Sequence, residues 1–126
     1  MSFDIYLVRF VAGEPAEGDA GAVLHTLAPY LAGARGDGFV QLSAADGSAD
    51  LYGLGSNSLM VSHISGESMW QVLVTVAAAG GYSIMPVGCP VCIAHENMRA
   101  ELPDEFYNEA VVVASGQDLR DVVLRA

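Results

Sequence analysis

The chain has 126 residues, of which 52% are apolar and 16% are charged, and its 15 acidic against five basic side chains give a formal net charge of -10. This length is typical of one domain with its own core, and this composition excludes an intrinsically disordered chain. The negative charge repels phosphate backbones and anionic headgroups, so we expect neither nucleic acid nor a membrane surface as partner. It favours encounter with a basic protein or a cation, and the alternative is that the charge serves solubility alone.

Alternating apolar and polar side chains, interrupted by glycine and proline, predict the first elements. Residues 3–11 alternate with a period of two, which predicts a strand. After a loop over residues 13–18, Asp19 is placed to cap a helix, because its carboxylate can accept a backbone N–H of the first turn. Pro29 should kink or split that helix, since it lacks a backbone donor. The buried face of the helix is predicted to consist of Leu24, Leu27, Ala28 and Leu31.

Three further strands are predicted as a meander over residues 39–44, 49–54 and 59–64. Between the first two, Asp46 and Gly47 form a pair that favours a two-residue type I′ turn, in which both central residues have positive φ. The meander therefore predicts antiparallel pairing of these strands.

The second half of the chain alternates helices with short strands. Ser65 is placed to cap a helix, and Gly80 with Gly81 should end it, because glycine adopts the left-handed conformation at low cost. Strands are predicted over residues 82–87 and 110–114, and the second is wholly apolar, which is typical of the middle of a sheet. Two more helices are predicted, over residues 94–102 and 117–125.

These elements follow the order β-α-β-β-β-α-β-(α)-β-α. The order predicts an α+β fold in which two to four helices pack on a mostly antiparallel sheet. The strand–helix–strand repetition in each half suggests a ferredoxin-like layout. No linker or change of composition divides the chain, so we predict a single α+β domain over residues 1–126.

Targeting signals are not evident in the sequence. Arg9 interrupts the N-terminal apolar run before it reaches the length of a signal peptide. The longest apolar run, residues 72–79, is much shorter than the roughly 20 residues that span a bilayer. Two cysteines three positions apart do not form a disulfide framework. We therefore expect a cytoplasmic protein.

The motif most suggestive of chemistry is Cys89-Pro-Val-Cys92, which follows a predicted strand and precedes a predicted helix. A Cys-x-x-Cys at a helix N-terminus favours redox chemistry, because the helix dipole lowers the pKa of a thiol. Alternatively, Cys89, Cys92 and His95 offer three ligands to a zinc ion, with His25, His63 or a second copy of the chain completing the set. In a third interpretation both cysteines are small buried side chains at a turn.

Other catalytic signatures are missing from the sequence. No serine lies in a Gly-x-Ser-x-Gly elbow, and no glycine-rich phosphate loop precedes a helix. His63, on a predicted strand, is expected to face solvent or to serve as a hydrogen-bonded structural histidine. An acidic segment near the C-terminus is either a solvated surface or a contact face for a basic partner; it contains Glu96, Glu101, Asp104, Glu105 and Glu109.

Three stretches resemble those of small bacterial proteins from high-GC genomes that have no assigned activity: residues 1–6, 85–90 and 102–105. A number of small acidic α+β proteins with similar openings are immunity proteins, which neutralise toxins. The resemblance implies a non-enzymatic binding domain, and the acidic surface points to a basic protein as its partner. The alternative is a thiol redox or zinc-binding protein that uses Cys89 and Cys92.

Overall fold

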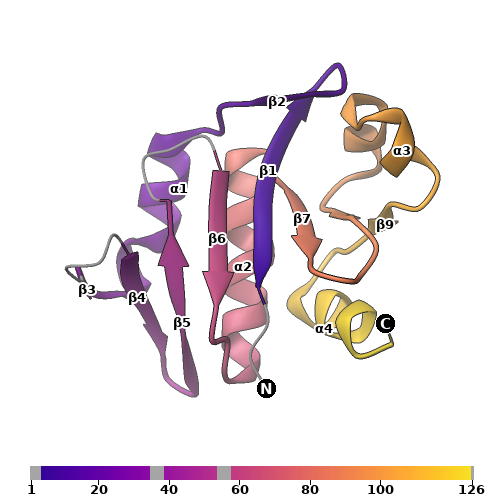
Figure 1. Cartoon of the computed structure of the whole chain (residues 1–126). Coiled ribbons are helices and arrows are strands. Elements are labelled where there is room, and N and C mark those ends of the chain that lie inside the picture. Colours follow the sequence, from indigo (N-terminus) through magenta and orange to yellow (C-terminus); the bar gives the residue numbers. More distant parts are fainter. Residues whose placement is uncertain (1–3, 35–38, 54–57, 126) are drawn as a thin grey trace.

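The computed structural model describes residues 4–34, 39–53 and 58–125, and Figure 1 shows how their elements are arranged. Its strands are β1 (Ile5–Val11), β2 (Glu14–Ala16), β3 (Leu31–Ala34), β4 (Phe39–Ala44), β5 (Gly47–Tyr52), β6 (Ser58–Ser62), β7 (Ser83–Pro86), β8 (Cys92–Ile93) and β9 (Val111–Val112). Its helices are α1 (Ala20–Leu27), α2 (Glu67–Gly80), α3 (Asp104–Tyr107) and α4 (Gly116–Arg125), with 3-10 turns η1 (Ala28–Tyr30) and η2 (Glu96–Glu101).

The described strands form one sheet in the order β3-β4-β5-β6-β1-β7-β8-β9, and β2 pairs with the end of β1. The first strand lies at the centre, antiparallel to both β6 and β7. Among the described strands, β8 and β9 are the parallel pair. Within this sheet, β1, α1, β5, β6, α2 and β7 have the β-α-β-β-α-β order of a ferredoxin-like layout. The predicted α+β fold with a mostly antiparallel sheet is confirmed.

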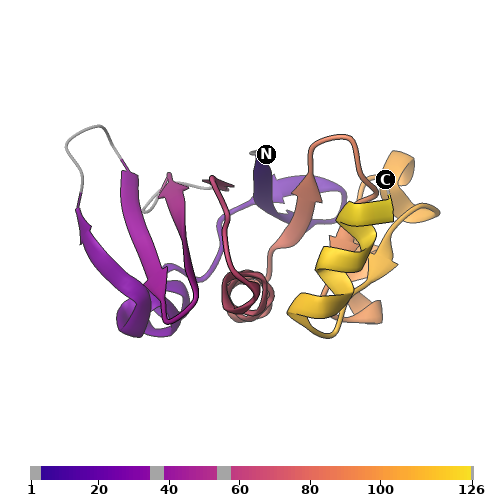
Figure 2. The same ribbon diagram turned by 90° about the horizontal axis from the view of Figure 1, so that it is seen from below.

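The three longer helices cover one face of the sheet. Figure 2 shows α1, α2 and α4 side by side along that face, with α2 in the middle. Apolar residues of β1, including Ile5 and Leu7, alternate toward the helices and are fully buried. From the helices, Leu27, Met69 and Leu119 enter the same core. The opposite face of β4, β5 and β6 carries no helix among the described residues (Figures 1 and 2). On β1 the same face is open around Tyr6, whereas Phe10 near the end of the strand contacts Phe106 of α3.

A second, smaller core lies beside the first. Val91, Ile93, Leu102 and Ala110 are buried there, and the partly buried Phe10 of β1 packs against them. This cluster attaches β8, η2 and α3 to the side of the sheet next to β7. It explains why the polar segment after the cysteines is ordered, although it contains only a 3-10 turn and one turn of α-helix.

The loop predictions around the first helix are partly wrong. Residues Glu14–Ala16 form β2 instead of a loop, because they pair with the end of β1. Pro29 does end the α-helix, and the chain continues as η1, so the predicted split is confirmed. Immediately afterwards, Leu31–Ala34 forms the edge strand β3, which the sequence pattern did not predict.

The β4–β5 hairpin turns one residue earlier than predicted. Ala44 pairs with Gly47, so the two central residues are Ala45 and Asp46, and neither has positive φ. The predicted type I′ turn is therefore wrong. Gly47 is needed for space: a Cβ atom there would overlap the carbonyl group of Ser65, whose oxygen accepts a hydrogen bond from the backbone N–H of Ser48.

The N-terminus of α2 also differs from the prediction. Ser65 does not cap it; the N-cap is Gly66, which has φ 84° and no side chain with which to cap. The Asp46 carboxylate accepts the backbone N–H of Ser68 at 3.2 Å instead, and hydrogen bonds from Ser68 lower the pKa of Asp46. Loop and helix are thus held together by one carboxylate.

The apolar strand predicted over residues 110–114 lies at an edge of the sheet and not in its middle. Only Val111 and Val112 are in β9, and both are exposed. Val113, just beyond the strand, is the fully buried residue of the segment. The run is apolar because Val113 packs in the main core and Ala110 in the smaller one. Its apolar character therefore does not indicate a central strand.

Candidate functional site

The two cysteines lie on a turn and on a strand, and neither is at the start of a helix. Cys89 is half-buried in the turn after β7. Cys92 is fully buried in β8, where it pairs with Ile84 on one side and Val111 on the other. The next helical element, η2, begins only at Glu96. The helix-dipole argument for a reactive thiol is therefore wrong for this chain.

Burial makes both thiols poor nucleophiles. Desolvation raises the pKa of Cys92 to about 12, and a smaller contribution comes from Cys89. Desolvation also raises the pKa of Cys89. Each thiol donates toward a nearby carbonyl oxygen, Cys89 to Val87 at 3.8 Å and Cys92 to Pro90 at 3.6 Å. Since the thiolate is the form that attacks disulfides and binds metals, the geometry opposes both chemistries at neutral pH.

The predicted zinc ligands do not come together. His95 is exposed at the N-terminal end of η2, and the described residues contain no group of three histidine, cysteine or acidic side chains that could hold a metal ion. His25 is exposed on α1. His63 lies just beyond β6 with φ 55°, and its Nδ1 is 3.0 Å from Oδ2 of Asp50, so the expected hydrogen-bonded, solvent-facing histidine is confirmed. Within the described part of one chain these residues form no zinc site, and a site shared by two copies of the chain stays a prediction.

Alkylation by iodoacetamide will test this description of the thiols. In the folded protein at pH 8 we expect Cys92 to stay unmodified, because a thiol of pKa about 12 is almost entirely protonated there and is buried. In denaturant both cysteines should react at the rate of a free thiol. Mass spectrometry after timed quenching measures the two sites separately. Fast labelling of Cys92 in the native protein would contradict the burial described here.

The helix-free face of the sheet brings together side chains that are far apart in sequence. In β1 the residues that alternate away from the core include Tyr6, which pairs directly with Met60 of β6. Met60 pairs in turn with Tyr52 of β5, and Tyr52 with Phe39 of β4. Because directly paired residues point to the same side of a sheet, these four side chains form one transverse row on the face without helices. We call Phe39, Tyr52, Met60 and Tyr6 the aromatic row.

The aromatic row is accessible to solvent, and two of its rings are in contact. The Tyr6 side chain is 41% exposed, and the other three are partly exposed. The rings of Phe39 and Tyr52 have centroids 5.0 Å apart at an interplanar angle of 34°. Cross-strand contacts of this kind fix the side chains in place before any partner binds, which lowers the entropic cost of binding.

Carboxylates flank the aromatic row. Asp50 lies two residues before Tyr52 on the same side of β5, and Asp4 lies two residues before Tyr6. Of the described arginines, Arg99, Arg120 and Arg125 form ion pairs with carboxylates of η2, α2 and α4. Beside the row, Nδ1 of His63, just beyond β6, lies 3.0 Å from Oδ2 of Asp50.

The acidic segment near the C-terminus has a structural role at two positions. The Glu101 carboxylate accepts the backbone N–H of Ala12 at 2.9 Å and so holds the β1–β2 turn. Glu96 pairs with Arg99 at 2.8 Å. Asp104, Glu105 and Glu109 are exposed, as a solvated surface or a contact face requires.

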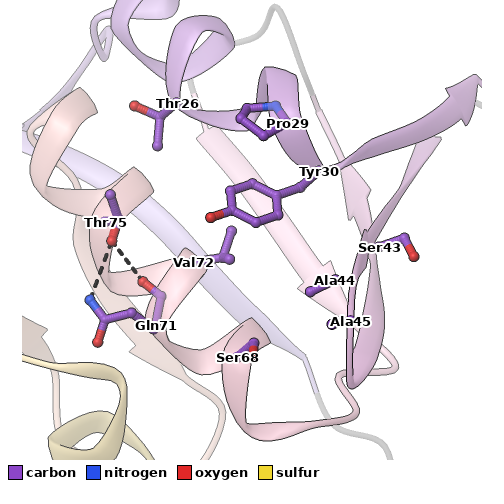
Figure 3. A pocket seen from close by; sticks show the side chains of 10 residues that line it. All are labelled: Thr26, Pro29, Tyr30, Ser43, Ala44, Ala45, Ser68, Gln71, Val72 and Thr75. Carbon is purple, nitrogen blue, oxygen red and sulfur yellow. Dashed lines mark hydrogen bonds between the residues drawn. The ribbon is translucent and has the colours of Figure 1, made fainter.

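An open cavity of about 650 Å³ lies on the helical side, between α1, α2 and the end of β4 (Figure 3). It has no charged lining residue: Tyr30 reaches across it above Val72, and Thr26, Ser43, Ser68, Gln71 and Thr75 contribute polar groups. Gln71 is already bound to Thr75 at 3.3 Å and, through Oε1, to the backbone of Gly116 at 2.8 Å. The cavity thus has few polar groups aimed at a ligand.

Sequence reasoning missed the aromatic row. A signal for it was present in residues 3–11, where Tyr6, Val8 and Phe10 make the second face of the strand nearly as apolar as the first. The residues that join Tyr6 in the row are set by the pairing register of β1, β6, β5 and β4, which the sequence pattern does not give.

Comparisons with protein-family models, with curated proteins and with solved structures found no match. Within the described ranges of the chain, no helix has both the length and the apolar character needed to cross a membrane. The function is therefore argued from the geometry of this chain.

Proposed function

We propose that this chain is a non-catalytic binding protein that holds a basic protein partner on the helix-free face of its sheet. The observation that carries the proposal is the aromatic row, four in-register side chains on four neighbouring strands with no helix over them. The resemblance to immunity proteins makes a basic toxin one such partner.

The chemistry of the row suits a protein contact. Aromatic and methionine side chains are enriched in the cores of protein interfaces, and tyrosine is prominent among the residues that carry most of the binding energy. Met60 lies between Tyr52 and Tyr6 and can adapt its flexible thioether to the partner's shape. An apolar centre with partly exposed polar neighbours such as Gln41 and Asp50 has the usual anatomy of an interface.

Charge complementarity selects a basic partner. The Asp4 and Asp50 carboxylates lie beside the row, and the whole chain has a formal net charge of -10. Such a field accelerates the approach of a positively charged protein and disfavours a second copy of this chain. Open sheets of this layout also bind RNA through aromatic side chains, but they need positive charge to hold the phosphates. That requirement is not met by Asp4 and Asp50.

A charge substitution at the centre of the row tests the proposal. The chain, immobilised as bait, recovers candidate partners from lysate of the source cells, and a recovered partner is then purified and titrated by calorimetry. For Met60→Glu we expect affinity to fall by about a hundredfold, because a charge replaces an apolar side chain at the centre of the contact. Ala78→Glu is the matched control: it adds the same charge at an exposed position of α2, away from the row, and should leave affinity unchanged.

The ionic-strength dependence tests the charge argument separately. Affinity should fall as sodium chloride is raised, because the attraction between surface charges is screened. The proposal fails if Met60→Glu binds like the unaltered chain, if the partner is acidic, or if the partner is nucleic acid. Light scattering that shows a dimer lost on Met60→Glu substitution would replace the basic partner with a second copy.

A further inference from the structure

A second cavity, of about 320 Å³, lies where the end of β1, the start of β7 and η2 meet. None of its lining residues belongs to the aromatic row. Unlike the cavity of about 650 Å³, it is lined by charged side chains of both signs. Its lining consists of Arg9, Phe10, Val11, Gly81, Ser83, Asn97, Met98 and Glu101.

The two charged side chains of this cavity are anchored without neutralising each other. Nη1 of Arg9 donates to the backbone carbonyl of Glu17 at 2.8 Å. Oε2 of Glu101 accepts the backbone N–H of Ala12 at 2.9 Å. Within the part of the chain that the structure describes, Arg9 and Glu101 form no ion pair with each other. The remaining guanidinium N–H groups and the second carboxylate oxygen stay available to a ligand.

Ser83 adds a buried polar group. Its side chain is only 1% exposed, and its hydroxyl has no hydrogen bond to any described residue. Among those residues, no side-chain polar atom is both sealed from solvent and unpaired. The Ser83 hydroxyl must therefore reach the cavity surface, where a ligand can supply the partner that a buried hydroxyl requires.

We propose that this cavity binds a free α-amino acid with a small or medium-sized side chain. The α-carboxylate lies against the Arg9 guanidinium, the α-ammonium lies against the Glu101 carboxylate, and Ser83 and Asn97 complete the hydrogen bonds. A zwitterion satisfies both charges at once, whereas a singly charged ligand leaves one of them uncompensated on desolvation. Phe10 and Met98 provide apolar surface for the amino-acid side chain. The site is independent of the partner face.

Titration of the full chain with L-alanine and L-methionine, followed by NMR of the backbone amides, tests this inference. We expect saturable shifts centred on Arg9, Ser83 and Asn97. N-acetyl-L-alanine methylamide, which lacks both charges, should give none. Acetate and methylammonium, which each carry one charge, should bind much more weakly than the amino acids.

Three substitutions locate the site. Ser83→Ala should weaken binding by about tenfold, as expected for one lost hydrogen bond to a charged ligand. Arg9→Gln and Glu101→Gln should abolish it, and the glutamine at 101 can still accept the Ala12 N–H that holds the turn. Met60→Glu should leave amino-acid binding intact, so failure of the partner proposal is distinguishable from failure of this one. Absence of shifts with both amino acids, or equal binding of the uncharged derivative, would overturn the inference.

Discussion

Alanine at position 47 is expected to lower the free energy of unfolding by about 3 kcal/mol, at the upper end of the usual cost of overpacking. The reason is steric: a Cβ atom on Gly47 would overlap the carbonyl group of Ser65, which is backbone and cannot rotate away. Gly47 does not have positive φ, so the loss would not come from backbone conformation. Urea unfolding followed by circular dichroism measures the change.

Gly21→Ala is the matched control for this substitution. Gly21 lies in α1, where a Cβ atom would meet only Oδ1 of Asp19 at an ordinary 3.6 Å. Replacing a helical glycine of this kind should raise stability by roughly 0.5 kcal/mol, because alanine has the higher helix propensity. If both substitutions had the same effect, the close contact between the β4–β5 hairpin and the start of α2 would be wrong.

Leu7→Ala is expected to lower the free energy of unfolding by about 3 to 4 kcal/mol, as the removal of a leucine from a close-packed core does. Leu7 is fully buried on the central strand, between β6 and β7, and the main core surrounds it. The surrounding structure can relax little into the cavity that the substitution leaves, because the strands on both sides of β1 fix its backbone. The same urea measurement applies.

The neighbouring residue Tyr6 provides the control for Leu7. Its side chain is 41% exposed on the helix-free face, so Tyr6→Ala should cost less than about 1 kcal/mol of stability. The same substitution should weaken partner binding, since it removes one member of the aromatic row. A large stability loss from Tyr6→Ala would contradict the assignment of the two faces of β1.

Together these substitutions separate stability from binding within a single strand. Leu7 and Ile5 hold the helices on one side of the sheet, and Tyr6 presents the aromatic row on the other. This division follows from the period of two along a strand. It allows the binding face to be altered without loss of the fold.

Local patterns in the sequence predicted most of the elements. Period-two alternation located β1, and glycine and proline located the ends of α1 and α2, because these signals act over a few residues. Signals that depend on distant contacts were misleading. The Asp46-Gly47 pair suggested a turn type, whereas the contact with Ser65 explains the glycine. The apolar run at 110–114 suggested a central strand, whereas it lies at the edge of the sheet and packs residues into both hydrophobic cores.

Prediction of the candidate site from the sequence was limited more than prediction of the elements, because the site depends on tertiary contacts. Cys89 and Cys92 had the spacing of a chemical motif, but pairing of Cys92 with Ile84 and Val111 buries its thiol in a strand. Spacing alone cannot report burial, and burial decides the pKa of a thiol.

The sequence by itself determined the α+β class, the antiparallel meander and the strong negative charge, since these follow from composition and short-range periodicity. Only the tertiary structure decided which face of β1 the helices cover, and only the register placed Phe39, Tyr52, Met60 and Tyr6 in one row. Both faces of that strand are apolar, so the choice between them rests on packing between segments that are dozens of residues apart.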